Sequence, residues 1–412
     1  RVFFTSAGSF MVTPNKNIQS SIFLTLLMSA LMAFTSLSTD VYLPAMPTMK
    51  QDLQGDIELT ITGFLIGFSI AQLIWGPIGD RIGRKLPLII GMTLFIVGSI
   101  GCACSQSIES IMFWRIFQAI GACTGPMLSR AMIRDLYPRD KAAHMLSTLF
   151  MIMAIAPIIG PVLGGQILKV SSWHAIFWML ALLGGMMLFL LRWLPETLPI
   201  ERRISAPISH TFGHYATLLI NGTFMQFTLC VTFYYVAAYA FITGSPQVYI
   251  NHYGIEPQYY GLLFALNILG VIGVSYFNRR LITKYSLEYL LKISSAIAAT
   301  AMSIMTLLVM LEVDSLAMVV CCIFIFFSMN GIIAACATTA ALDMVPNLAG
   351  SGSALIGSLQ YGSGILSSVL LAILPSESPV SMAWIMAGFS LASAFTAVLS
   401  HRKANCRKLL PS

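Results

Sequence analysis

The sequence has very few charged residues. Only 9% of its 412 residues are Asp, Glu, Lys or Arg, whereas 57% are hydrophobic; soluble domains carry roughly 25% charged residues. A chain this poor in charge cannot cover a folded surface with water-soluble side chains. The scarcity excludes an ordinary soluble protein and predicts a protein whose main solvent is lipid.

Patterns of metal binding, disulfide formation and catalysis are missing as well. The eight cysteines fall mainly inside hydrophobic runs, where cysteine behaves as a small apolar residue, and the six histidines are scattered. The sequence contains no zinc spacing, P-loop or nucleophile elbow. We therefore expect no metal, no cofactor, no nucleic-acid partner and no enzymatic activity.

What the sequence does contain is a series of hydrophobic runs of about 20 residues, the length at which a helix crosses roughly 30 Å of hydrocarbon. Lipid offers the backbone no hydrogen-bond partners, and runs this continuous are helical. We predict an all-α membrane protein with 12 transmembrane helices in two six-helix halves around a central cavity. The expected spans are 20–43, 59–79, 87–105, 108–132, 144–168, 173–194, 217–243, 258–278, 289–311, 315–341, 349–374 and 380–400.

The basic residues predict the orientation of these spans. With the N-terminus inside, all but three of the 23 Lys and Arg residues fall in cytoplasmic segments, and the exceptions are Lys50, Lys169 and Arg115. This asymmetry is the one that the positive-inside rule requires. Both termini are therefore expected in the cytoplasm.

The longest polar connection divides the chain into its two halves. It reads PETLPIERRISAPISHTFGHY, from Pro195 to Tyr215; the alternative interpretation is an ordinary cytoplasmic loop, which leaves the count of spans unchanged. The chain begins at Arg1, and Met11 is a candidate for the native start. The predicted parts are a tail at 1–19, a half at 20–194, a linker at 195–216, a half at 217–400 and a tail at 401–412.

Two charged residues lie within or at the end of predicted spans, where a charge costs roughly 2.5 to 3.5 kcal/mol by insertion scales. Asp40 ends the first span and Arg115 lies about 10 Å into the fourth, so both should lie at similar depth near the outer face. An acid beside a low-dielectric cavity can couple a carrier to protons. Asp40 and Arg115 are therefore the candidate proton-coupling residues. The alternatives are an interfacial helix cap for Asp40 and a structural ion pair or snorkelling side chain for Arg115.

Other polar residues inside the spans are candidates for a substrate cavity. Each one alone is more often an interhelical hydrogen bond than a ligand contact. As a group, together with 24 methionines, they fit an adaptable apolar cavity for varied ligands. The candidates are Gln118, Gln226, Tyr234, Tyr235, Asn267, Asn330 and Tyr361.

Three motifs carry a resemblance to a known family. The loop GPIGDRIGRK matches the G-x-x-x-D-R-x-G-R-K pattern typical of the major facilitator superfamily, and RIFQAIG resembles its R-x-x-Q-G element, with Ala119 in place of the usual glycine. The run APIIGPVLGG resembles the motif of the family's antiporters, with Ala156 in place of a glycine. The residues that match the loop pattern and the antiporter motif are Gly76, Asp80, Arg81, Gly83, Arg84, Pro157, Gly160, Pro161, Gly164 and Gly165.

Within that superfamily, the segments STDVYLPAMP, MIRDLYP, SSWHAIFWML, LPETLP and TGSPQVYI resemble the Bcr/CflA-type bacterial drug:proton antiporters. The resemblance implies a monomer in the bacterial inner membrane that exports small apolar compounds in exchange for protons. It also implies that Asp40 and Arg115 match coupling residues, and that Asp80 and Arg81 hold a cytoplasmic gate with Arg134 as a partner.

We therefore predict proton-coupled efflux by alternating access, with a small-molecule substrate, protons and the bilayer as partners. The first alternative is a proton-linked or facilitated transporter of a nutrient such as a nucleoside or sugar, which the antiporter-type fifth span disfavours. The second is a membrane enzyme or sensor, for which no catalytic motif is present.

Overall fold

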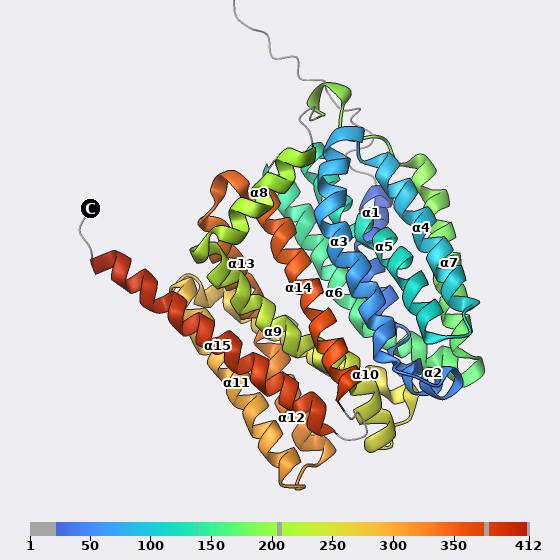
Figure 1. The fold of residues 1–412 in the computed structure, drawn as a ribbon. Coiled ribbons are helices and arrows are strands. Elements are labelled where there is room, and N and C mark those ends of the chain that lie inside the picture. The colour runs from blue at the N-terminus through green and yellow to red at the C-terminus, as the bar shows by residue number, and fades with distance from the viewer. Residues whose placement is uncertain (1–21, 138, 204–207, 375–378, 410–412) are drawn as a thin grey trace, which may run out of the picture.

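The computed structural model describes residues 22–137, 139–203, 208–374 and 379–409, and all regular elements within them are helices (Figure 1). The predicted N-terminal tail, with Met11, lies outside the described residues. The elements of the first half are α1 (Ile22–Asp40), η1 (Leu43–Ala45), α2 (Met46–Leu53), α3 (Glu58–Ile82), α4 (Lys85–Ala103), α5 (Ile108–Leu136), α6 (Arg139–Val170), α7 (Trp173–Leu190) and η2 (Leu191–Trp193). The remaining elements are η3 (Ile200–Arg202), α8 (Ile208–Ile220), α9 (Gly222–Pro246), η4 (Gln247–His252), α10 (Pro257–Leu281), α11 (Leu287–Met310), α12 (Leu316–Ser328), α13 (Asn330–Asp343), η5 (Pro346–Leu348), α14 (Ala349–Ile373) and α15 (Pro379–Leu409).

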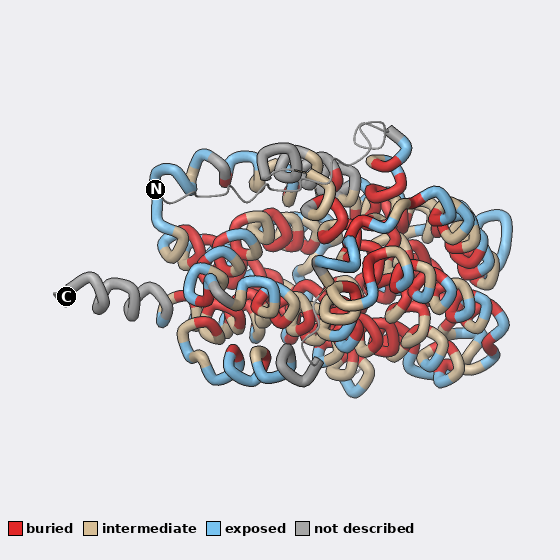
Figure 2. The backbone as a smooth tube through the Cα atoms, turned by 90° about the horizontal axis from the view of Figure 1, so that it is seen from above, coloured by how far each residue is buried: buried red, intermediate tan, exposed pale blue. Residues whose placement is uncertain are grey.

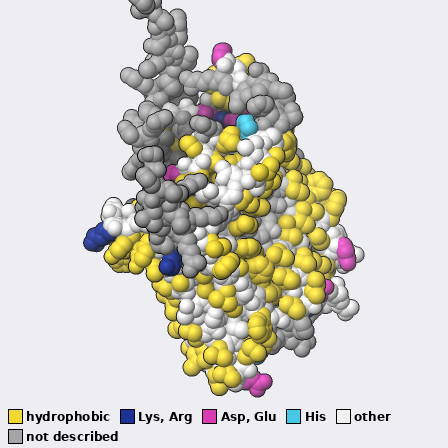
Figure 3. All heavy atoms as spheres, turned by 60° about the vertical axis from the view of Figure 1, so that its left-hand side comes forward, with side chains coloured by type: hydrophobic (Ala, Val, Ile, Leu, Met, Phe, Trp, Pro, Cys, Tyr) yellow, Lys and Arg dark blue, Asp and Glu magenta, His cyan; other side chains and the backbone are white. Residues whose placement is uncertain are grey.

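The helices have the length and composition of membrane spans. Among the described residues, ten helical segments are long and apolar enough to cross a bilayer. Helices α5 and α6, with 29 and 32 residues, are also long enough at about 1.5 Å per residue. Figure 3 shows one flank of the molecule covered mainly by hydrophobic side chains, as a lipid-facing surface requires. The predicted all-α membrane protein is confirmed.

The chain packs as two helical bundles that meet along two lines of contact. Helix α3 packs against α14, and α6 packs against α10. Figure 2, which views the molecule from above, shows that the buried residues concentrate inside the combined bundle. We call the end that carries residues 191–203 and α8 the linker end, and the opposite end, which carries α2, the far end (Figure 1).

Side chains that cap backbone groups begin four of the helices. The first turn of a helix leaves amide groups without partners. Ser107, Asn221, Ser286 and Ser315 each accept a hydrogen bond from the backbone amide three residues on, at the starts of α5, α9, α11 and α12. These caps fix where the helices begin after short connections.

Glycine allows the helices of the first half to approach at backbone distance. A Cβ atom added at Gly63 would lie 2.4 Å from the Met112 carbonyl oxygen, and one added at Gly67 would lie 2.4 Å from that of Ile116. Both contacts join α3 to α5. This G-x-x-x-G spacing therefore serves close helix packing.

The structure differs from the predicted spans where the second half begins. A single span was expected over 217–243, but α8 ends at Ile220 and α9 begins at Gly222. Between them Asn221 takes an extended ψ of 98°, and its side chain caps α9 by accepting from the Phe224 amide at 3.1 Å. The cap divides the hydrophobic run, so part of the expected linker and the start of the expected span form the separate helix α8.

Candidate functional site

A cavity of about 340 Å³ lies between the two halves. Helices α1, α3, α5 and α6 supply one wall, and α9, α10, α12, α13 and α14 supply the other. A site shared by two halves is the usual place for the substrate of a secondary transporter. The lining residues are Thr35, Ser36, Thr39, Asp40, Ile61, Leu65, Arg115, Met153, Pro157, Tyr235, Ala238, Tyr239, Ile242, Phe264, Ile268, Val271, Ile272, Phe327, Asn330 and Tyr361.

Among the described residues that line this cavity, Asp40 is the only acidic one. It is the last residue of α1, and only 6% of it is exposed. The Thr39 hydroxyl donates to its Oδ1 at 3.0 Å. The ion pairs of the described residues both belong to Arg84, so Asp40 and Arg115 share the cavity without a direct ion pair. The carboxyl group is therefore buried next to an open space, with the Thr39 hydrogen bond but without a direct ion pair.

Arg115 belongs to the same wall and is completely buried. Its Nη1 donates to the Ser38 carbonyl at 2.8 Å and to Gln118 Oε1 at 2.6 Å. The guanidinium carbon lies 4.5 Å from the ring centre of Tyr42 and 4.4 Å from that of Phe64. Nε and Nη2 have no hydrogen-bond partner, and the two aromatic faces stabilise the cation instead.

The antiporter-type motif on α6 packs directly against the end of α1 that carries Asp40. A Cβ added at Gly160 would lie 3.1 Å from the Asp40 Cβ, and one at Gly164 would lie 1.7 Å from the Val41 carbonyl oxygen. Pro157 lines the cavity itself, and Pro161 is buried in the same helix. The motif therefore sets the close packing around Asp40.

The next glycine of that motif joins the two halves. A Cβ at Gly165 would lie 2.6 Å from the Pro257 carbonyl oxygen at the start of α10, and one at Gly261 would lie 2.5 Å from the Val162 amide nitrogen. These contacts hold α6 and α10 together near the far end. The two halves are therefore packed backbone on backbone between α6 and α10 near the far end.

The wall from the second half is aromatic and carries no charge. Tyr235, Tyr239 and Tyr361 line it with neighbouring ring centres about 6 Å apart, and Tyr361 also lies 4.0 Å from Phe68. Asn330, at the break between α12 and α13, also lines the cavity and leaves its buried Oδ1 without a partner. This wall offers flat apolar surfaces with a few hydrogen-bonding groups, which suits an uncharged aromatic or amide-bearing ligand.

Four of the candidate cavity residues do not line this space. Gln118 donates to Ser99 at 2.8 Å and supports Arg115 from behind, and Tyr234 donates to the Phe326 carbonyl at 3.0 Å inside the second half. Gln226 lies on α9 away from the lining, and Asn267 is 2% exposed with neither amide atom partnered. A polar residue in a span can face either a neighbouring helix or a cavity. Its position in the sequence therefore did not distinguish cavity-lining residues from residues that bond a neighbouring helix.

A cluster of charges lies at the linker end of the first half. Arg84 Nη1 binds Asp80 Oδ1 at 2.7 Å, and its Nε binds Asp135 Oδ2 at 2.9 Å. These bonds join the end of α3 to the end of α5. Burial acts to lower the pKa of Arg84, but the two carboxylates together outweigh burial and raise it. Arg81, one residue after Asp80, forms neither of these ion pairs.

Glu196 completes this cluster, and the sequence patterns did not identify it as a site residue. Its carboxylate accepts from the backbone amides of Arg84, Lys85, Thr197 and Leu198. Burial raises its pKa, but these bonds outweigh burial and hold the pKa below its ordinary value.

Gly83 makes room for this arrangement, whereas Gly76 lies within α3. Gly83 has φ +100°, and a Cβ there would lie 2.5 Å from Glu196 Oε2; a Cβ at Gly76 would lie 3.2 Å from Met127. Glycine at position 83 is thus required both by its backbone and by the carboxylate above it. Arg134 lies on α5, but its side chain is outside the described residues.

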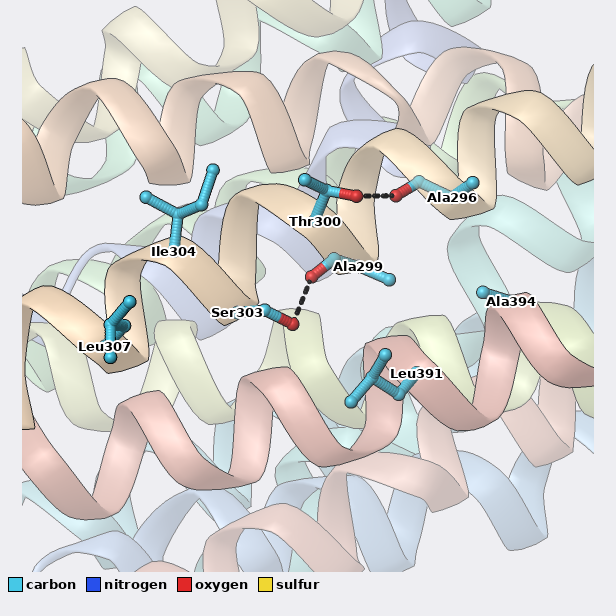
Figure 4. Close-up of a pocket in the computed structure, with 8 residues that line it drawn as sticks. All are labelled: Ala296, Ala299, Thr300, Ser303, Ile304, Leu307, Leu391 and Ala394. Atoms are coloured by element: carbon cyan, nitrogen blue, oxygen red, sulfur yellow. Dashed lines mark hydrogen bonds between the residues drawn. The ribbon is translucent and has the colours of Figure 1, made fainter.

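A second cavity, of about 420 Å³, lies on the flank of the second half between α11 and α15 (Figure 4). The hydroxyls of Thr300 and Ser303 on its wall donate at 2.8 Å to the carbonyls of Ala296 and Ala299, in their own helix. Exposed Leu307 and Leu391 border it. It offers no free polar group and forms part of the surface that faces lipid.

Comparison with known proteins identifies the family. A family model described as Major Facilitator Superfamily matches residues 26–368. The chain belongs to the major facilitator superfamily. It is thus a transporter-family protein and not an enzyme.

Individual relatives indicate which branch of the superfamily the chain resembles. The chain is 34% identical to an uncharacterized MFS-type transporter, YdgK, of Bacillus subtilis (strain 168), over 85% of this chain and 88% of the relative. It is 28% identical to a bicyclomycin resistance protein homolog of Haemophilus influenzae (90% and 94% covered), and 29% identical to multidrug resistance protein D of Escherichia coli K12 (89% and 93% covered). The expected resemblance to drug-resistance transporters of the Bcr type is confirmed.

Solved structures confirm the fold alone. A D-xylose-proton symporter superposes with a TM-score of 0.75 at 14% identity, over 91% of this chain and 96% of the other. A mutant of the nucleoside transporter NupG superposes with the same TM-score of 0.75 at 12% identity, over 92% of this chain and 99% of the other. At such identities, transporters of unrelated substrates share one arrangement of helices.

Proposed function

We propose that this protein is a secondary transporter of a bacterial inner membrane that exports small, mostly apolar compounds in exchange for protons. The observation that carries the proposal is the cavity between the halves, in which Asp40 is the only acid among the described lining residues and faces an uncharged aromatic wall. The drug-resistance names of its relatives favour export. In this reading the linker end and both termini face the cytoplasm, as the distribution of Lys and Arg favours.

The contacts of α6 supply a mechanism of alternating access. The backbone packing of Gly165 on Pro257 closes the far end, which would be the periplasmic side. A compound would enter the cavity from the linker end and lie against Tyr235 and Tyr361. Protonation of Asp40 removes a buried charge beside Gly160 and Val41, and thereby changes the free energy of the packing that closes the far end.

The proton gradient supplies enough free energy for this exchange. One charge moving through 100 mV yields about 2.3 kcal/mol, and one pH unit adds about 1.36 kcal/mol. A single proton can therefore sustain a drug gradient of more than roughly tenfold.

The test uses purified protein in liposomes with an imposed pH gradient. Chloramphenicol and bicyclomycin serve as first probes, because relatives carry these names. We expect drug movement opposite to the proton gradient and stimulation when the gradient is steepened. Drug flux that ignores the gradient, or uptake of a sugar or nucleoside in the direction of the proton, would instead favour the nutrient transporter.

A further inference from the structure

Two prolines in helices of the first half each leave one backbone carbonyl without its usual donor. Proline has no N–H, so the carbonyl four residues earlier loses its helical hydrogen bond. Pro126 in α5 does this to Ala122, whose carbonyl accepts instead from the Thr35 hydroxyl at 3.3 Å. Pro77 in α3 does the same to Leu73. The first replacement donor comes from α1, within the same half.

The replacement donor for Leu73 comes from outside the first half. The Tyr215 hydroxyl, on α8, donates to the Leu73 carbonyl at 3.1 Å. Tyr215 is 6% exposed, and burial and then Asp80 both raise its pKa. The hydroxyl therefore remains protonated, and remains a donor, at neutral pH.

Helix α8 lies between the two halves at the linker end. It packs against α9 and α14 of the second half and contacts α3 of the first (Figure 1). Leu218, one turn beyond Tyr215, is completely buried. Helix α3 continues from Leu73 through Pro77 to Asp80, which binds Arg84. The Tyr215 hydrogen bond thus joins α8 to the part of α3 that carries the charge cluster.

We propose that Tyr215 is a positioning residue for the conformational change, because its hydroxyl replaces the N–H that Pro77 lacks and fastens α8 to α3 in the conformation seen here. The bond is made in this state and released when the linker end rearranges. Without it, this state loses one buried hydrogen bond and its population falls relative to the alternative by about fivefold. The proposal rests on the alternating access proposed above, but its test needs no transport substrate.

The test is a double-mutant cycle in which the readout is a distance. Nitroxides are attached to p-acetylphenylalanine at Ile82 on α3 and at Met344 after α13, which are 38% and 40% exposed, and the distance distribution is measured in nanodiscs. We expect Tyr215→Phe to lower the population of the present separation by about fivefold. In Pro77→Ala the backbone N–H returns, so adding Tyr215→Phe should change the population by less than about twofold.

The control is Tyr289→Phe, at an exposed tyrosine near the same end. It should leave the distribution unchanged. The proposal would be overturned if Tyr215→Phe left the distance distribution unchanged, or shifted it equally with and without Pro77. If the Pro77→Ala protein does not insert into the membrane, Pro77→Ser restores the same backbone N–H. If the variants show the coupled shift but the wild-type protein shows no proton-driven drug movement in liposomes, the proposed function is refuted and this inference stands.

Discussion

The two walls of the cavity differ in chemistry and in packing. The first-half wall holds Asp40 and, behind it, Arg115 with its aromatic partners, and glycines bring α6 into backbone contact beside the acid. The second-half wall has tyrosines and an amide but no charged residue. The same difference exists at the linker end, where both ion pairs of the described residues lie in the first half.

This difference suggests separate roles for the two halves, with proton coupling in the first half and substrate recognition in the second. Protonation of an acid in a glycine-packed wall changes the free energy of the helix packing around it. A neutral aromatic surface, by contrast, can bind compounds of many shapes. Changes in the first half should therefore abolish coupling, and changes in the second half should alter which compounds are moved. The predictions below test that division, beginning with the largest effect.

Removing the acid should have the largest effect. We expect Asp40→Asn to reduce proton-driven drug movement in liposomes to that of protein-free vesicles, because the amide cannot exchange a proton. Binding of a neutral drug, measured by calorimetry, should persist. Asp343→Asn, at an exposed residue at the linker end of α13, is the matched control. Full gradient-driven transport by Asp40→Asn would place the coupling elsewhere.

Replacing the buried cation should weaken transport less completely. Arg115→Lys keeps the charge but loses the planar group that bonds Ser38 and Gln118 and lies between two rings. Charged hydrogen bonds of this kind contribute about 1.5–3 kcal/mol, so we expect transport to fall roughly tenfold or more. Initial rates at a fixed pH gradient measure this. A rate equal to wild type would mean that only the charge matters.

Adding one methyl group beside Asp40 should destabilise the protein. The Cβ of Gly164→Ala would meet the Val41 carbonyl oxygen at 1.7 Å, so α6 and α1 must separate, at a cost of about 1–3 kcal/mol. Gly185→Ala provides the comparison, because no atom lies within 4 Å of its Cβ, and it should be neutral or slightly stabilising. Thermal unfolding in detergent separates the two. Equal melting temperatures would contradict the close packing of α6.

The sequence predicted the first wall better than the second, for a physical reason. A charge in a span is costly wherever it lies, so Asp40 and Arg115 were identified from sequence alone, and the structure brings both to one cavity. A tyrosine or amide in a span is compatible with either a cavity or a helix contact. Tyr234 and Tyr235 are neighbours, yet only Tyr235 lines the cavity. Glu196 could not be found by span analysis, because its role depends on amides 111 and 112 residues earlier in the chain.

Tyr234 and Tyr235 together provide a test of the second-half wall. Tyr235→Phe removes a hydroxyl from the cavity, and we expect efflux rates to change by about threefold to tenfold for compounds that hydrogen-bond with it and little for others. Proton coupling should stay intact. Tyr234→Phe removes a hydroxyl that bonds Phe326 outside the cavity, so it should not alter the order of preferred substrates. A uniform loss across a drug panel in both variants would contradict the assignment.

The smallest effect is expected at Glu196, where it depends on pH. Its pKa is below the ordinary 4.5 in the folded protein, because bonds from backbone amides outweigh burial. A lowered folded pKa means that ionised Glu196 stabilises the fold above its unfolded pKa, and that this stabilisation is lost as pH falls through the folded value. The group is partly exposed, so solvent screens the effect. We expect Glu196→Gln to lower the melting temperature at pH 7 by only about 1–2 °C. The difference from wild type should shrink as pH falls below the ordinary 4.5 and through the lowered pKa of the folded protein. Glu201→Gln, at an exposed residue in the same segment, should show neither change. A difference that persists in acid would mean that the carboxylate charge is not what holds the loop at Gly83.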